Sequence, residues 1–161
     1  MEIRVYEDKF QQQVVDLILS IQQQEYNIQI TKEDQPDLLD ISSFYQRGNG
    51  EFWVALHEDL VVGTISLLDI GNGQLALRKM FVNKNYRGPS HKVAQQLLNV
   101  ALTHARVTAV NEIYLGTTPE FKAAQRFYEK NGFQSILKEQ LPEAFPIVHV
   151  DRHFYVYILA E

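Results

Sequence analysis

Apolar residues at strand-like and helix-like spacings divide the first third of the chain into predicted elements. Residues 3–6 alternate as a short strand. Asp8 would then cap a first helix, because apolar side chains recur after it at the spacing of one helix face. That face consists of Phe10, Val14, Leu17, Ile18 and Ile21. A polar connection follows, and a second, shorter helix is predicted over roughly residues 36–46, ending at Gly48-Asn49-Gly50.

The middle of the chain is predicted to form three consecutive antiparallel strands. Residues 51–57 and 60–69 are rich in Trp, Val, Ile and Leu, and Glu58-Asp59 separates them as a hairpin turn. Gly71-Asn72-Gly73 forms the next turn, and residues 74–82 form the third strand of this series.

A strand–helix–strand crossover follows. Residues 90–108 predict a helix, and residues 112–117 predict a short strand of the buried type. One stripe of the helix carries Val93, Leu97, Val100, Ala101 and His104. Such a unit makes its two strands parallel and its connection right-handed.

The last third is predicted to contain one helix and two strands. Thr118 would cap the helix with Pro119 at its first position, and the helix would run to Lys130, where Asn131-Gly132 stops it. Residues 134–139 and 153–159 read as strands. With no linker or repeat visible, we expect a single α/β domain of mixed α+β type over residues 1–161, in the order β-α-α-β-β-β-α-β-α-β-β.

Composition excludes several classes of protein. The 161 residues are 45% hydrophobic and 22% charged, as in ordinary globular domains. The absence of cysteine excludes disulfides, thiolate zinc sites and a cysteine nucleophile, and no histidine–carboxylate spacing indicates another metal site. The N-terminus does not resemble a signal peptide, and no run approaches the ~18 apolar residues of a membrane span. We therefore expect a cytoplasmic protein without a metal or a membrane partner.

The charge is unevenly distributed. The net charge of −5 argues against general nucleic-acid binding. Residues 70–111, however, contain no Asp or Glu, although they carry six basic residues. These are Arg78, Lys79, Lys84, Arg87, Lys92 and Arg106. A cationic surface on an acidic protein indicates an anionic ligand, although a merely solvated basic face has the same composition.

The loop over residues 83–92 has the features of an anion site. It connects a predicted strand to a predicted helix N-terminus, whose first N–H groups have no partner inside the helix and favour negative charge. The loop lacks the G-x-x-x-x-G-K-[ST] pattern, which argues against a P-loop nucleotide site.

Three stretches resemble the GCN5-related N-acetyltransferase (GNAT) superfamily. They are LRKMFVNKNYRG followed by KVAQQLL, then EIYLGTT, then AAQRFYEKNGF at residues 123–133. The resemblance implies a largely antiparallel mixed sheet of about seven strands, splayed between the fourth and fifth, with about four helices. It also implies that acetyl-coenzyme A is held in the gap.

The resemblance assigns roles to individual residues. Tyr128 would be the general acid that protonates the departing coenzyme A thiolate, although a half-buried tyrosine of the core would match the pattern as well. The residues implied for coenzyme binding are Met80, Phe81, Val82, Arg87, Gly88, Pro89, Ser90, His91, Lys92, Val93, Ala94, Thr117, Phe121, Ala124, Phe127 and Tyr128.

The chain departs from the family pattern at three places. The pyrophosphate loop has two extra residues, so that Lys92 stands where a glycine is usual, and we hypothesise that its ammonium contacts a phosphate. Phe121 replaces an asparagine, and Ala76 replaces a glutamate that often serves as the base. The base therefore stays open between an ordered water and five side chains. These are Asp69, His57, Glu25, Asp151 and His153.

The resemblance therefore predicts an acetyl-CoA-dependent N-acetyltransferase that moves an acetyl group to a primary amine by direct attack. The acceptor would be a small molecule or a protein amine, and the protein a monomer or a homodimer. The acidic character of segments 25–39 and 142–151 and their surroundings mildly favours a cationic acceptor. The acidic residues are Glu25, Glu33, Asp34, Asp37, Glu139, Glu143 and Asp151. The alternative is a non-catalytic acyl-CoA binding or sensing module on the same fold.

Overall fold

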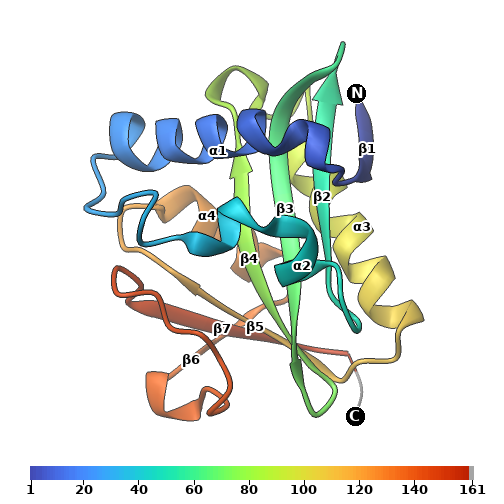
Figure 1. Ribbon diagram of the computed structural model, residues 1–161. Coiled ribbons are helices and arrows are strands. Elements are labelled where there is room, and N and C mark those ends of the chain that lie inside the picture. Colours follow the sequence, from blue (N-terminus) through green and yellow to red (C-terminus); the bar gives the residue numbers. More distant parts are fainter. Residues whose placement is uncertain (160–161) are drawn as a thin grey trace.

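The computed structural model describes residues 1–159, and over them the chain forms one mixed sheet flanked by helices (Figure 1). The strands are β1 (Glu2–Val5), β2 (Glu51–His57), β3 (Leu60–Gly71), β4 (Gln74–Val82), β5 (Glu112–Thr117), β6 (Gln134–Ile136) and β7 (His153–Ile158). The helices are α1 (Gln11–Leu19), α2 (Ile41–Tyr45), α3 (Val93–Val107) and α4 (Lys122–Lys130). The last two residues of the domain predicted over 1–161 lie outside the described residues.

The sheet has the order β1-β2-β3-β4-β5-β7-β6. Only β4 and β5 pair in parallel, and all other neighbours are antiparallel. The predicted hairpin, the crossover and the seven-stranded mixed sheet are therefore confirmed. No helix over residues 1–159 combines the length and the hydropathy that crossing a bilayer requires.

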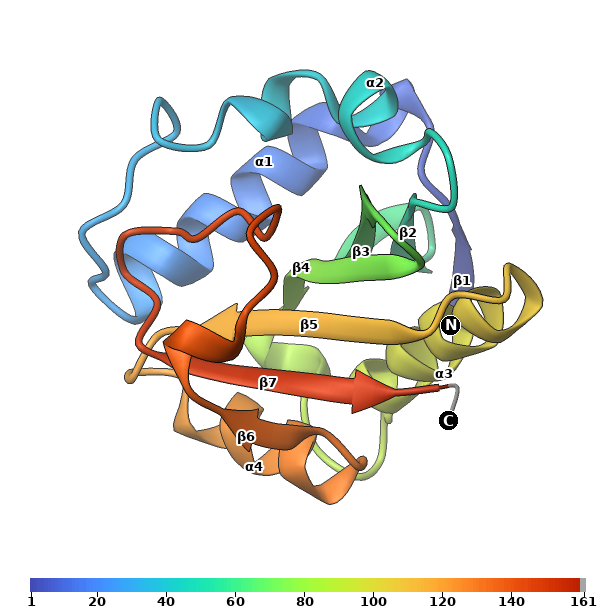
Figure 2. The ribbon, with the colours of Figure 1, turned by 90° about the horizontal axis from the view of Figure 1, so that it is seen from below.

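Helices cover both faces of the sheet (Figure 2). On one face α1 and α2 pack their apolar side chains, including Val14 and Ile18, against Phe52 of β2. On the other face α3 buries Leu97 and Ala101 in a second core. Burial of alternate strand residues on opposite faces is what the period of two requires.

The N-terminal helices differ from the prediction. A 3₁₀ turn (Asp8–Phe10) precedes α1, and Asp8 is not its cap but accepts a hydrogen bond of 2.5 Å from the Ser42 hydroxyl. The predicted second helix is interrupted, because the backbone of Asp40 has φ −149° and ψ 50° between a 3₁₀ turn (Pro36–Leu39) and α2. Local spacing could not indicate these breaks, since a contact 34 residues away holds Asp8.

The two later helices each begin three residues beyond their predicted starts. Helix α3 begins at Val93 rather than residue 90, after Lys92 in the left-handed conformation. Thr118 is not the cap of α4, because a turn in which Phe121 N–H bonds Thr118 O (3.1 Å) comes first. The predicted end at Gly132 is confirmed, with φ +95° there and a bond of 3.0 Å from Phe133 N–H to Tyr128 O.

The sheet opens between β4 and β5. Their pairing ends at Ala76 and Tyr114, so β4 continues through Leu77 to Val82 without a partner on that side. The predicted splay between the fourth and fifth strands is thereby confirmed. A strand edge that leaves its neighbour has free backbone donors and acceptors, which a ligand is able to use.

A β-bulge deforms β4 beside this opening. Thr64 of β3 pairs with Phe81 and Ser66 pairs with Arg78, so two residues of β4 lie opposite one of β3. One of the two is Lys79, whose φ is +54°. Its carbonyl accepts a hydrogen bond from the Thr64 hydroxyl (2.7 Å), and the Arg78 carbonyl accepts one from the Ser66 hydroxyl (2.6 Å). Two buried hydroxyls thus replace the ladder bonds that the bulge removes.

Candidate active site

A cavity of about 350 Å³ lies where β4 and β5 separate. Its walls come from β4, the loop before α3 and the first turn of that helix, the end of β5, α4 as far as Tyr128, and the segments that follow α1 and precede β7. Ten predicted coenzyme-binding residues line it: Met80, Phe81, Val82, Arg87, Ala94, Thr117, Phe121, Ala124, Phe127 and Tyr128. Residues from four distant parts of the sequence therefore meet at one opening of the sheet.

The remaining predicted coenzyme residues lie outside this cavity. Val93 is buried in the core beneath α3, where its side chain would touch a Cβ on Gly63. The exposed members are Gly88, Pro89, Ser90, His91 and Lys92. These five form the surface loop before α3, and their contact with a coenzyme stays a prediction.

Lys92 adopts a backbone conformation that glycine adopts most easily. Its φ of +54° and ψ of 29° lie in the left-handed region, which costs a non-glycine residue roughly 1 kcal/mol. Gln96 N–H is the first in α3 to bond a carbonyl of the preceding loop, that of Lys92 at 3.1 Å. The N–H groups of the α3 residues before Gln96 have no partner inside the helix, and such groups at a helix N-terminus are available to a ligand.

Arg87 is held at the edge of the cavity. Its Nε donates to Val82 O (2.8 Å), and its two terminal nitrogens bind both oxygens of Glu25 at 2.5 and 2.9 Å. The hydrogen bonds from Arg87 lower the pKa of the Glu25 carboxyl. Glu25, one of the candidate bases, is thus engaged in an ion pair.

Tyr128 lies deep in the cavity. It is 5% exposed, and its hydroxyl is 3.6 Å from the sulfur of Met80. Burial, with smaller contributions from Asp151 and Tyr155, raises the pKa of the Tyr128 phenol well above its ordinary value. The phenol therefore stays protonated at neutral pH.

Asp151 is the candidate base that lines the same cavity. Its carboxylate lies over Gly116 of β5, where a Cβ would be 2.8 Å from Oδ2. Burial raises the pKa of Asp151 to about 6, and the nearby cations Arg78 and Lys79 act against this shift. Asp151 N–H bonds Val148 O and Arg152 N–H bonds Thr117 O, both at 3.0 Å, which fixes the segment beside β5.

The other candidate bases lie elsewhere. The carboxylate of Asp69 accepts hydrogen bonds from Asn49 N–H (2.9 Å) and Gly71 N–H (2.8 Å), so it stabilises turns. His57 and His153 are exposed and do not line the cavity. Asp151 is thus the member of that set positioned to take a proton from a molecule in the cavity.

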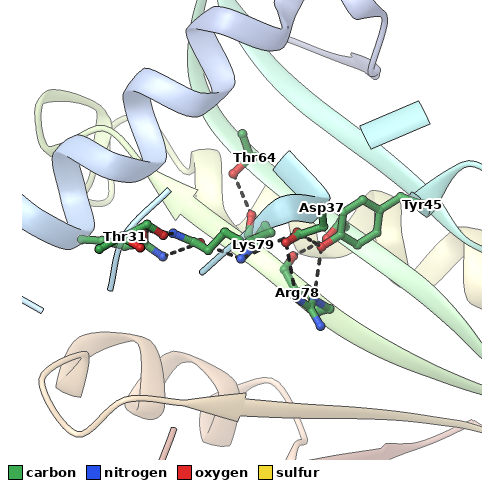
Figure 3. Close-up of polar contacts among 9 residues, drawn as sticks. Thr31, Asp37, Tyr45, Thr64, Arg78 and Lys79 are labelled. Atoms are coloured by element: carbon green, nitrogen blue, oxygen red, sulfur yellow. Dashed lines mark hydrogen bonds and ion pairs between the residues drawn. The ribbon is translucent and has the colours of Figure 1, made fainter. Parts of the chain in front are cut away.

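Sequence reasoning missed the role of Lys79, which was considered only as part of the basic region. Its side chain is 7% exposed, its Nζ donates to Gln35 Oε1 (2.7 Å) and lies 3.7 Å from Asp37 Oδ2 (Figure 3). Burial lowers the pKa of Lys79 to about 8. A usable indication was present, because two adjacent charged residues inside the apolar strand LRKMFV break its alternation and indicate a bulge.

Asp37 completes this buried group (Figure 3). Its Oδ2 accepts a hydrogen bond of 2.6 Å from the Tyr45 hydroxyl, which in turn accepts one of 3.1 Å from Arg78 Nε. The guanidinium of Arg78 also lies 3.8 Å from Asp37 Oδ1. This arrangement orients Arg78 and Lys79 at the wall of the cavity.

The comparison with known proteins agrees with this geometry. The model of the acetyltransferase (GNAT) family matches residues 15–133, more than half of the chain. The chain belongs to the GNAT family. A probable N-acetyltransferase family 8 member 5 from Mus musculus is 31% identical over 133 residues, which cover 74% of this chain and 57% of that protein. The chain spans about half the length of the curated relatives it matches.

Solved structures of the family superpose closely. A GNAT-family acetyltransferase from Staphylococcus aureus Mu50 has a TM-score of 0.94 and 39% identity, with 98% of each chain covered. The PaiA N-acetyltransferase from Thermoplasma acidophilum, solved with coenzyme A, has a TM-score of 0.74 at 16% identity over 98% of both chains, a likeness of fold. The predicted membership of the GNAT superfamily is therefore confirmed.

Proposed function

We propose that the protein transfers an acetyl group from acetyl-CoA to the primary amine of an acceptor. The observation that carries the proposal is that a buried acid and a buried base line one cavity. Tyr128 holds its proton at neutral pH, whereas Asp151, with a pKa of about 6, is mostly ionised there. The two groups are near enough that the charge of Asp151 contributes to the raised pKa of Tyr128.

The residues at the opening fit a coenzyme A thioester. From Leu77 to Val82, β4 has no partner strand on the side of β5, so the backbone groups on that side are available to an amide-rich pantetheine arm. Thr118 Oγ1 is buried beside the cavity and has no hydrogen-bond partner within residues 1–159. A buried hydroxyl without a partner costs stability, and a polar ligand would satisfy it.

The bound thioester would supply an activated carbonyl carbon and a thiolate leaving group. Asp151 takes a proton from the acceptor nitrogen as its bond to that carbon forms, and backbone N–H groups of β4 donate to the carbonyl oxygen. Tyr128 donates its proton to the sulfur as the carbon–sulfur bond breaks. The desolvation that raises the phenol pKa also disfavours a free thiolate, which keeps this transfer feasible.

Replacement of Tyr128 by phenylalanine tests the proposal. We expect thiol release from acetyl-CoA with an accepted amine to fall roughly 10²–10⁴-fold, because a positioned general acid contributes that much. Coenzyme A should still raise the melting temperature of the variant. Wild-type turnover by Tyr128→Phe would contradict the assignment of the acid.

The alternative is an acyl-CoA sensor, favoured by Ala76 at the place of the family's usual glutamate. Ala76 is fully buried at the last position where β4 pairs with β5, and it offers no base. A sensor would be stabilised by coenzyme A, by about 2.7 kcal/mol at a hundredfold excess over Kd. It would release no thiol with any member of a broad amine panel.

A further inference from the structure

We call the part of the cavity beside Asp151, Arg78 and Lys79 its acceptor end, because the proposed base Asp151 lies there. The charged groups that line it or lie directly behind its wall are balanced. Arg78 and Lys79 supply two positive charges, and Asp37 and Asp151 supply two negative charges. Asp37 pairs with both cations, and both cations lower the pKa of the Asp151 carboxyl, as Arg152 and His149 also do from outside the cavity. An added ion without its own counter-ion would therefore be uncompensated in a poorly solvated site, which is unfavourable.

Lys79 has spare hydrogen-bonding capacity at the wall of the cavity. An ammonium has three N–H donors, and its hydrogen bond within residues 1–159 goes to the neutral amide of Gln35. The Asp37 oxygen lies 3.7 Å away, beyond hydrogen-bond range, and is already bonded to Tyr45. A carboxylate placed beside Lys79 would accept a charge-assisted bond that the resting protein does not supply.

The rest of the acceptor end is apolar. Ile28 and Ile30 reach it from the segment after α1, and Phe145, Val148 and Val150 reach it from the segment before β7. A contact of 3.1 Å between His149 Nε2 and Gln29 O joins the two segments. The end is thus enclosed by two linked loops, which suits a small molecule with an apolar body.

The acidic residues that suggested a cationic acceptor are mostly elsewhere. Asp151 lines the cavity, Asp37 is buried and paired with Lys79, and Glu25 is paired with Arg87. The other members, Glu33, Asp34, Glu139 and Glu143, are exposed outside the cavity. A polyamine would bring several positive charges to a wall where Asp151 is the lining carboxylate beside the cations Arg78 and Lys79, and where Asp37 behind that wall is already paired with both cations. The geometry therefore disfavours that acceptor class.

We propose that the acceptor is a small α-amino acid with an apolar side chain. Its amine lies at Asp151, its carboxylate accepts from Lys79, and its side chain packs against the two loops. This inference rests on the proposed acetyl transfer and specifies its acceptor. A zwitterion adds no net charge to the balanced group, whereas an ammonium without a carboxylate adds one. The bound ammonium first loses one proton to solvent, and the neutral nitrogen then gives its second proton to Asp151 as it attacks the thioester.

Matched pairs of acceptors test the proposal on the wild-type protein. Thiol release is measured with L-phenylalanine and L-leucine, with their decarboxylated amines phenethylamine and isoamylamine, with L-phenylalanine amide, and with spermidine. We expect kcat/KM to be at least tenfold higher for each amino acid than for its decarboxylated partner, as for a charge-assisted hydrogen bond. Equal or better use of the decarboxylated amines, or of spermidine, overturns the acceptor class but leaves acetyl transfer intact.

A binding measurement distinguishes recognition of the carboxylate from transfer of the acetyl group. At saturating coenzyme A, L-phenylalanine should raise the melting temperature, and phenethylamine at equal concentration should raise it less. If no amine is acetylated although this difference appears, the proposed transfer fails while the recognition of a carboxylate stands. If neither molecule shifts the melting temperature and none is acetylated, both proposals fail.

The variant Lys79→Gln tests the residue itself. Glutamine still donates to the amide of Gln35 but has no charge, so the ratio of kcat/KM for L-phenylalanine to that for phenethylamine should fall at least tenfold. Lys130→Gln, an exposed substitution at the end of α4 outside the cavity, is the matched control and should keep the ratio. An unchanged ratio in Lys79→Gln would remove Lys79 from the proposal.

Discussion

Replacement of Asp151 by asparagine should make the protein more stable and much less active. Asparagine keeps the size of the side chain but accepts no proton from an amine. If Asp151 is the general base, kcat should fall roughly 10²–10⁴-fold. The activity of the wild type should rise as pH increases through about 6, the pKa of this carboxyl, and the variant should lack that dependence.

The gain in stability follows from the same shift in pKa. Burial raises the pKa of Asp151 from 3.8 to about 6, so between these values the folded protein binds the proton more tightly than the unfolded chain. The free energy of unfolding therefore falls as pH rises through this window, and above it the buried carboxylate costs about 3 kcal/mol at most. A neutral asparagine avoids this cost, which corresponds to a rise of roughly 5–10 °C in Tm.

The measurement is a melting curve at pH 4 and pH 7.5, combined with thiol release between pH 5 and 8.5. The stability difference between wild type and variant should appear at pH 7.5 and shrink toward pH 4, where both side chains are neutral. Glu143→Gln, an exposed change in the same segment, should alter neither quantity. A variant that melts below the wild type at pH 7.5, or that retains the wild-type pH profile, would refute the reasoning.

Three further substitutions probe neighbouring features of the site. Gly116→Ala should lower kcat at least tenfold and leave the affinity for coenzyme A nearly unchanged, because the new Cβ would lie 2.8 Å from Oδ2 of Asp151 and displace that carboxylate. An unchanged kcat would contradict the placement of Asp151 over Gly116. Lys92→Gly should raise the free energy of unfolding, measured in denaturant titrations, by roughly 1 kcal/mol, since glycine adopts the left-handed backbone conformation without strain. A lower free energy of unfolding would show instead that the Lys92 side chain stabilises the loop. Glu25→Gln should leave the pH dependence of kcat unchanged and cost at most about 1 kcal/mol, as for a partly exposed ion pair with Arg87; a lost pH dependence would instead make Glu25 the base.

The order of the elements and the opening of the sheet could be predicted from local patterns and family resemblance. Strand alternation gave the three central strands within two residues, and the Asn131-Gly132 pair marked the end of α4 because a left-handed residue is needed there. The helix starts were less predictable. Thr118 and Asp8 are suitable caps by type, but the Asp8 carboxylate accepts from Ser42 instead, and Thr118 Oγ1 has no hydrogen-bond partner within residues 1–159.

The chemistry of the cavity depends on residues that only folding brings together. Asp151 was one of several candidate bases in the sequence, and its distinction comes from lying over Gly116, 35 positions earlier, at a place that desolvates its carboxylate. Lys79 reads as one more basic residue of a strand until the bulge turns it against Asp37. Periodicity is a local property of the chain, whereas desolvation and charge balance depend on neighbours in space. The sequence alone therefore determined the order of the strands and helices and, through the family resemblance, the choice of Tyr128. The tertiary structure decided that Asp151 is the carboxylate, and Lys79 the cation, at the wall of the cavity.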